Sequence, residues 1–103
     1  MFGLAVVLMT ASSANAAGDR IAGAKVMPKC QVCHGKDGLA KLPEAPNIAG
    51  QKESYLIRVL KAFKSGERQS PQMSLVAKGL SDEDIANIAA YYASIKVTVE
   101  IPP

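Results

Sequence analysis

The amino-acid sequence predicts one small all-α domain. Its 103 residues are enough for a single domain and too few for two. In several stretches apolar residues recur at three- and four-residue spacing, which is the pattern of helices with one buried face. Before the tail at residues 97–103 there is no alternating apolar and polar pattern of the kind that strands show, and there is no internal repeat. We therefore expect helices joined by loops.

The amino-terminal segment differs from the rest of the chain. Residues 1–17 carry no charge and run from the apolar "FGLAVVLMT" into the small-residue "ASSANA", where Ala14 and Ala16 form an A-x-A pattern. This order predicts a secretory signal, although a basic amino-terminal region is missing. The apolar run is much shorter than the roughly 20 residues that span a bilayer, so an uncleaved anchor is the less favoured alternative. We expect a signal segment at 1–17, a domain at 18–96, an extended tail at 97–103, and export from a bacterial cytoplasm.

The first expected helix runs from Asp19 to about Val26, with Asp19 at the end where the helix dipole favours an acid. Pro28 follows and disfavours helix at the residue before it, which predicts a break or kink just ahead of the cysteines. Residues 35–50 are rich in glycine and proline and are expected to form a loop.

A second helix is expected from about Glu53 to Ser65, because its apolar residues share one face, and Gly66 is a suitable stop. Residues 67–79 are expected to form a second loop, with at most one helical turn after Met73. The clearest helix signal covers 80–96, where Ser81 can cap the helix and Asp84 follows three residues later.

The stretch "CQVCH" places Cys30, Cys33 and His34 together, and these are the only cysteines and the only histidine in the chain. A structural zinc site needs four ligands, and only three nitrogen or sulfur candidates exist here. A thioredoxin-like dithiol needs a βαβ context, which a helical chain does not offer. The third interpretation is covalent attachment of a c-type haem, in which the histidine after the second cysteine ligates the iron. The spacing favours this interpretation.

Such a haem iron needs a sixth ligand or a deliberately open position. With no second histidine available, Met73 in its proline-flanked loop is the preferred axial ligand, and Lys78 is the alternative. Met27 lies on the same short segment as the cysteines, so it is expected to pack in the core.

The chain resembles class I c-type cytochromes, in particular small bacterial monohaem proteins of the c553 and c4-like kind. The resemblance extends from about Gly18 to Lys96 and rests on "CQVCHG", "PNIAG", "YLIRVLKAFKSGER", "PQM" and "LSDEDIANIAAYYAS". It implies a small class I cytochrome c fold, with about three to four helices wrapped around one covalently bound haem c and its iron.

The resemblance also implies roles for individual residues. Pro46 would offer its carbonyl to His34 Nδ1, and Ile48 would pack on the haem. Gly23 would let the last helix cross the first closely. For Tyr55, haem packing and plain core packing stay open. Close relatives often carry a polar residue where Val59 stands, so Arg58 is the substitute candidate for contacts to the haem propionates. The apolar wrapping is expected from Leu42, Ile48, Leu56, Leu60, Phe63, Leu75 and Leu80.

These expectations together predict a periplasmic electron carrier, not an enzyme. Donor dehydrogenases and acceptor oxidases or reductases would dock at the haem edge, where Lys29, Lys36 and Lys41 could orient acidic partners. The net charge is only +3 and the basic residues are scattered, which disfavours nucleic-acid binding. We expect a monomer without a stable membrane span. The alternative is a tightly bound cytochrome subunit of a periplasmic dehydrogenase complex; a haem peroxidase is disfavoured because Met73 can close the iron site.

Overall fold

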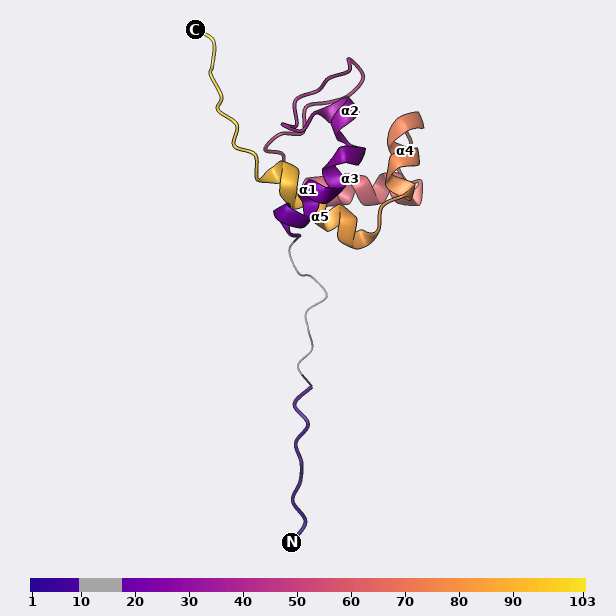
Figure 1. Cartoon of the computed structure of the whole chain (residues 1–103), viewed down its shortest axis with the longest axis vertical. Coiled ribbons are helices and arrows are strands. Elements are labelled where there is room, and N and C mark those ends of the chain that lie inside the picture. The colour runs from indigo at the N-terminus through magenta and orange to yellow at the C-terminus, as the bar shows by residue number, and fades with distance from the viewer. Residues whose placement is uncertain (10–17) are drawn as a thin grey trace.

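The computed structural model describes residues 1–9 and 18–103, and in this part of the chain the fold is all-α, as predicted (Figure 1). No strand occurs in these residues. The helices, with one 3₁₀ turn η1 among them, are α1 (Arg20–Val26), η1 (Met27–Lys29), α2 (Gln31–His34), α3 (Glu53–Ser65), α4 (Pro71–Lys78) and α5 (Asp82–Ala93). Figure 1 shows α1, α3 and α5 crossing at the centre, with α4 at one side.

The first and last helices form the closest helix pair. Gly23 in α1 is buried, and a Cβ there would overlap the carbonyl oxygen of Asn87 and come within 2.8 Å of the Tyr91 Cβ. The prediction that Gly23 permits a close crossing is therefore confirmed. The Asn87 side chain also accepts a hydrogen bond from the backbone N–H of Asp19 at 2.9 Å. The amino end of α1 is thus fixed to the middle of α5.

The hydrophobic core lies between α1, α3 and α5. Its largest fully buried side chains are Tyr92, Leu80 and Ile85. Met27 is buried in the same cluster, as expected. Helix α3 packs against both α5 and α4, so α4 reaches the core through α3.

Three expected helices match closely, and the region before α5 does not. Asp19 caps α1, α3 has the predicted bounds, and Ser81 and Asp84 form a reciprocal capping box on α5. The expected loop over 67–79 is wrong, because Ser70 caps a two-turn helix with Pro71 at its first position. The expected break before the cysteines is present: α1 ends at Val26, and a 3₁₀ turn that contains Pro28 leads from it toward α2. Within residues 1–9 and 18–103 there are thus five α-helices against the expected three to four, and α2 is a single turn.

Both ends of the chain lie outside the helical group. Residues 1–9 and 97–103 have no regular secondary structure and are exposed, and the carboxy-terminal segment leaves α5 as an extended stretch (Figure 1). The predicted signal segment continues through residues 10–17, which lie outside the described part. None of the described helices is long and apolar enough to cross a membrane.

Candidate functional site

His34 ends the one-turn helix α2, and its side chain is buried. Its Nδ1 lies 2.9 Å from the carbonyl oxygen of Pro46. A carbonyl oxygen only accepts hydrogen bonds, so Nδ1 carries the proton and donates it. The lone pair of the neutral ring is then on Nε2, which is the arrangement that second-sphere partners impose on metal-ligating histidines.

The loop after α2 holds Pro46 in place through its own hydrogen bonds. The Lys41 N–H donates to the Cys33 carbonyl at 2.8 Å, and the Ile48 N–H donates to the Gly38 carbonyl at 2.8 Å. The Asn47 side chain accepts from the Ala40 N–H at 2.7 Å. These bonds fold residues 35–50 back on the cysteine segment, so the Pro46 carbonyl meets the histidine ring.

A cavity of about 290 Å³ opens beside this histidine. Its walls are mostly apolar, and its lining includes Cys30, His34, Met73 and Tyr92 together with side chains of α3. A smaller cavity of about 80 Å³ is lined by Cys33 and shares His34, Pro46 and Met73 with the first. The shared lining residues make the two cavities neighbours, and the larger one is close to the lower end of the 300–1,000 Å³ usual for small-molecule sites.

Met73 lines both cavities from the third position of α4. The Ser70 hydroxyl oxygen accepts a hydrogen bond from the Met73 N–H at 3.3 Å, which fixes the first turn of this helix. The methionine is therefore carried on a helix and not on the expected loop. Lys78, the alternative ligand, is exposed at the far end of α4 and lines neither cavity.

The two cysteines are free thiols. Burial raises the pKa of Cys30 to about 11, whereas reactive redox thiols have lowered pKa values. Within residues 1–9 and 18–103 no group of three His, Cys, Asp or Glu side chains is placed to hold a metal ion. The geometry thus favours neither the dithiol nor the zinc interpretation. Two thiols, an imidazole nitrogen and a thioether sulfur lining two neighbouring, mostly apolar cavities do fit a c-type haem.

The remaining predicted site residues divide into two groups. Ile48 and Tyr55 line the larger cavity. Arg58 is exposed, does not line it, and stacks on Tyr55, with its guanidinium carbon 5.4 Å from the ring centroid. Of the expected apolar wrapping, Leu75 points to solvent with 74% exposure. It lies on the outer side of α4, and a segment expected to be a loop predicts no such side.

Two hydrogen bonds that join α5 to the residues after His34, here called the tyrosine tethers, are not predicted from the sequence. The Tyr92 hydroxyl donates to the Gly35 carbonyl at 2.8 Å, and the Tyr91 hydroxyl donates to the Lys36 carbonyl at 2.7 Å. The two rings meet edge to face with centroids 5.0 Å apart. Burial raises the pKa of Tyr92 well above its ordinary value, so this hydroxyl stays a donor. Both tethers hold the chain immediately after His34. The adjacent aromatic pair "YY" was the only sequence signal for them.

Known proteins resemble this chain over most of its length. The family model described as Cytochrome c matches residues 16–96. Cytochrome c4 of Pseudomonas aeruginosa is 44% identical over 84% of this chain and 43% of its own length. Cytochrome c-554(548) of Halomonas halodenitrificans is 47% identical over 76% of this chain and 98% of its own length.

Structural comparison gives the same neighbours. The crystal structure of reduced recombinant cytochrome c4 from Pseudomonas stutzeri matches with a TM-score of 0.73 and 38% identity, over 81% of this chain and 48% of that one. A more distant relative, named a thiosulfate dehydrogenase electron acceptor in Stutzerimonas stutzeri, is 32% identical over 67% of this chain and 33% of its own length. The chain thus spans less than half of several relatives and almost all of another.

Proposed function

This chain belongs to the cytochrome c family, and on that premise we propose that it is a periplasmic one-electron carrier with His34 and Met73 as the axial ligands of its haem iron. Membership of the family gives it a covalently bound haem c and a role in electron transport. The haem supplies one-electron chemistry, with a potential raised by histidine and methionine ligation. Cys30 and Cys33 are the proposed attachment points.

One observation carries this proposal: His34 and Met73 line the same two cavities from different helices, α2 and α4. The hydrogen bond from His34 Nδ1 to Pro46 fixes the ring and leaves Nε2 free to ligate. The Met73 thioether would close the sixth position to small substrates, and the apolar walls would exclude water. These are the properties of a carrier and not of an enzyme.

A pair of methionine variants tests the ligation. Met73→Leu keeps the side-chain volume and removes the sulfur, so the oxidised protein should lose its sulfur-to-iron charge-transfer band. Met27→Leu is the matched control, because Met27 is buried in the core and does not line the cavities. A wild-type protein without the band, or a Met73→Leu protein that retains it, would show that the axial assignment is wrong.

The periplasmic location rests on residues 1–17. If they are a cleaved signal, the protein purified from a periplasmic extract should begin close to Gly18, and its mass should include one haem. A protein that keeps residues 1–17 and sediments with the membranes would contradict this part of the proposal. Intact mass spectrometry of the native protein makes the distinction.

Partner docking is proposed at the face around α2, where Lys29, Lys36 and Lys41 are exposed. Lys41 also lies 3.3 Å from the Asp37 carboxylate, which reduces its effective charge. Electrostatic steering by this face predicts electron-transfer rates that fall as ionic strength rises. Stopped-flow reduction by an acidic redox protein at several salt concentrations would measure this. A rate that does not change with salt would contradict steering.

The second candidate is a tightly bound subunit of a periplasmic dehydrogenase. The relative named as a thiosulfate dehydrogenase electron acceptor supports a dehydrogenase as the electron donor. Size-exclusion chromatography of the native extract separates the two candidates. A free carrier elutes at the mass of one chain, and a subunit co-elutes with a stoichiometric partner.

A further inference from the structure

Two arginines stack on aromatic side chains of the same helix, α3, and only one of them faces the cavity. The Arg58 guanidinium carbon lies 5.4 Å from the Tyr55 ring centroid, and that of Arg68 lies 5.0 Å from the Phe63 ring centroid. Arg68 lines the larger cavity, whereas Arg58 does not. Both side chains are exposed guanidinium groups stacked on an aromatic ring, but only the Arg68 side chain lines the cavity.

Local backbone structure explains why Arg68 returns to the cavity. Helix α3 ends at Gly66, whose φ of +85° is a left-handed conformation that glycine adopts without strain. The chain then reverses, and the Arg68 N–H donates to the Ala62 carbonyl at 3.1 Å. Phe63 is buried and lines the cavity, and Arg68, stacked on its ring after this reversal of the chain, lines the cavity as well.

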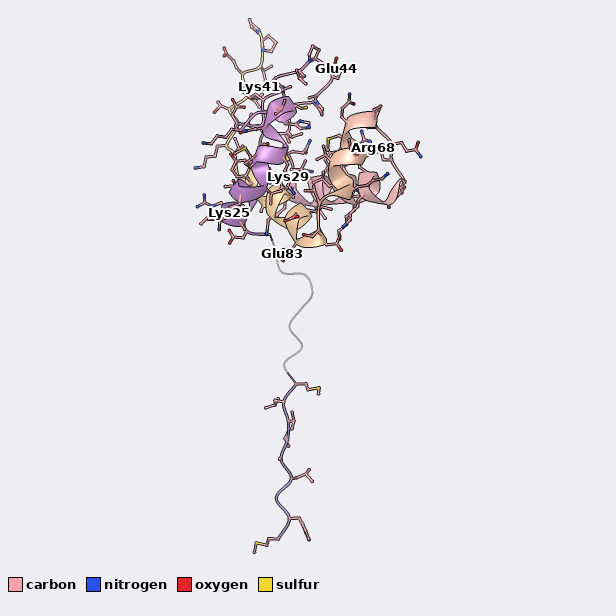
Figure 2. The ribbon with its side chains drawn as sticks, turned by 45° about the vertical axis from the view of Figure 1, so that its right-hand side comes forward. Lys25, Lys29, Lys41, Glu44, Arg68 and Glu83 are labelled. Carbon is pink, nitrogen blue, oxygen red and sulfur yellow. The ribbon has the colours of Figure 1, made fainter. Side chains whose placement is uncertain are left out.

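The charges at the cavity edge are few. Among the described residues that line the two cavities, Glu44 is the one acidic side chain, and Arg68 is the one basic side chain apart from His34. Figure 2 shows Arg68 on the α3–α4 side of the molecule, away from Lys25, Lys29 and Lys41 on the side of α1 and α2. The lysines of the proposed docking face are therefore not the cations of this edge.

A haem adds two propionate carboxylates to any site that holds it. Partly buried carboxylates need a partner, and the planar guanidinium matches a carboxylate with two parallel hydrogen bonds. We propose that Arg68, and not Arg58, pairs with a haem propionate in this chain. The proposal rests on the proposed function, because it takes the haem to occupy this cavity.

The pairing assigns Arg68 a positioning role with an electrostatic consequence. A positive charge beside the haem favours the reduced state and the ionised propionate. Removing it should raise the ratio of oxidised to reduced protein at a fixed applied potential by about two- to fivefold, the size expected for one partly screened charge. It should also move the pH dependence of the potential to higher pH, because the propionate loses the partner of its ionised form.

The experiment compares Arg68→Gln with Arg58→Gln in the haem-loaded protein. Spectroelectrochemical titrations from acid to alkaline pH give the potential and its pH dependence for each variant. We expect Arg68→Gln to show both shifts and Arg58→Gln to match the wild type, although each loses a stacked cation. Arg68→Lys should recover most of the shift in potential, because it restores the charge, and less of the shift in pH dependence, because it lacks the two-pronged geometry.

Equal shifts in the two glutamine variants, or none in either, would overturn the proposal. A second measurement does not depend on any variant folding: the Arg68 Nε–H signal in the ¹⁵N NMR spectrum of the wild type should be protected from exchange and should move with redox state. An unprotected, redox-insensitive signal would likewise overturn it.

The sulfur-to-iron charge-transfer band is measured in the same samples. If the band is present and the arginine variants do not behave as expected, only the pairing of Arg68 with a propionate is wrong. If the band is absent from the wild type, the assignment of Met73 as axial ligand is wrong.

Discussion

Replacing Tyr92 with phenylalanine removes one hydroxyl from the buried interior, and Tyr91→Phe removes the equivalent group from its neighbour. Tyr92 is 2% exposed, and its hydroxyl donates to the carbonyl of Gly35, which is itself buried. Tyr91 makes the same kind of bond to Lys36 at an exposed position. The two variants therefore differ mainly in access to water. We expect Tyr92→Phe to destabilise the protein clearly more than Tyr91→Phe.

The magnitude follows from what replaces each bond. Without the Tyr92 hydroxyl, the Gly35 carbonyl keeps only a 3.3 Å contact from the Gly38 N–H, so a buried acceptor becomes undersatisfied. That loss costs about 1–2 kcal/mol, whereas water can replace the exposed Tyr91 bond at a cost of about 0.5 kcal/mol or less. In a domain of this size each kcal/mol lowers the melting temperature by about 4–8 °C.

Thermal unfolding of the oxidised, haem-loaded variants, followed by circular dichroism, measures both effects. Tyr92→Phe should melt about 4–16 °C below the wild type, and Tyr91→Phe should melt within about 4 °C of it. Equal losses would refute the reasoning, because they would show that burial of the bond does not set its contribution. A larger loss in Tyr91→Phe would refute the tether assignment itself.

The remaining predictions concern helix packing, capping and acid stability. Gly23→Ala should cost more than about 2 kcal/mol by urea unfolding, because its Cβ would overlap the Asn87 backbone, while Gly79→Ala, whose nearest atom would be 3.5 Å away, should be close to neutral. Ser81→Ala should cost about 1 kcal/mol by the same assay, and adding Asp84→Ala should cost less than the sum, because the two side chains cap α5 reciprocally. The hydrogen bond from the Leu39 N–H, together with Lys41, lowers the pKa of Asp37 below 3.8. The ionised Asp37 carboxylate therefore stabilises the folded state above that pH, and this contribution is lost as the pH falls through the lowered pKa. NMR titration should find this low pKa, and Asp37→Asn should reduce the acid sensitivity.

The parts of the fold with local signals could be predicted from the sequence. Asp19, Ser81 and Gly66 mark helix ends through chemistry that acts within one turn, and the structure agrees with each of them. The segment before α5 is predicted wrongly, because its glutamine, serine and proline composition is typical of a loop. Pro71 in fact occupies the first position of α4, where proline is favoured and its missing N–H has no helical partner to lose.

The site shows the same division. The cysteine and histidine spacing indicates a c-type haem, and the sequence favours Met73 over the alternative Lys78 for the other axial position. The choice between Arg58 and Arg68 depends on where the chain turns after Gly66, and no residue pattern shows that turn direction. The hydroxyl tethers of Tyr91 and Tyr92 depend on how α5 packs over residues 35 and 36, which are more than 50 positions away.

The pairing of α1 with α5 also bears on the order in which the chain can fold. The bond from Asp19 to Asn87 joins residues 68 positions apart, and the Tyr92 bond to Gly35 spans 57. Closing such long loops costs entropy that only the completed contact repays, so neither forms until α5 has been synthesised. In a growing chain the cysteine segment therefore emerges early, before the helix that later binds the residues just after it. Until that helix docks, the carbonyls of Gly35 and Lys36 have no tyrosine hydroxyl to hold them.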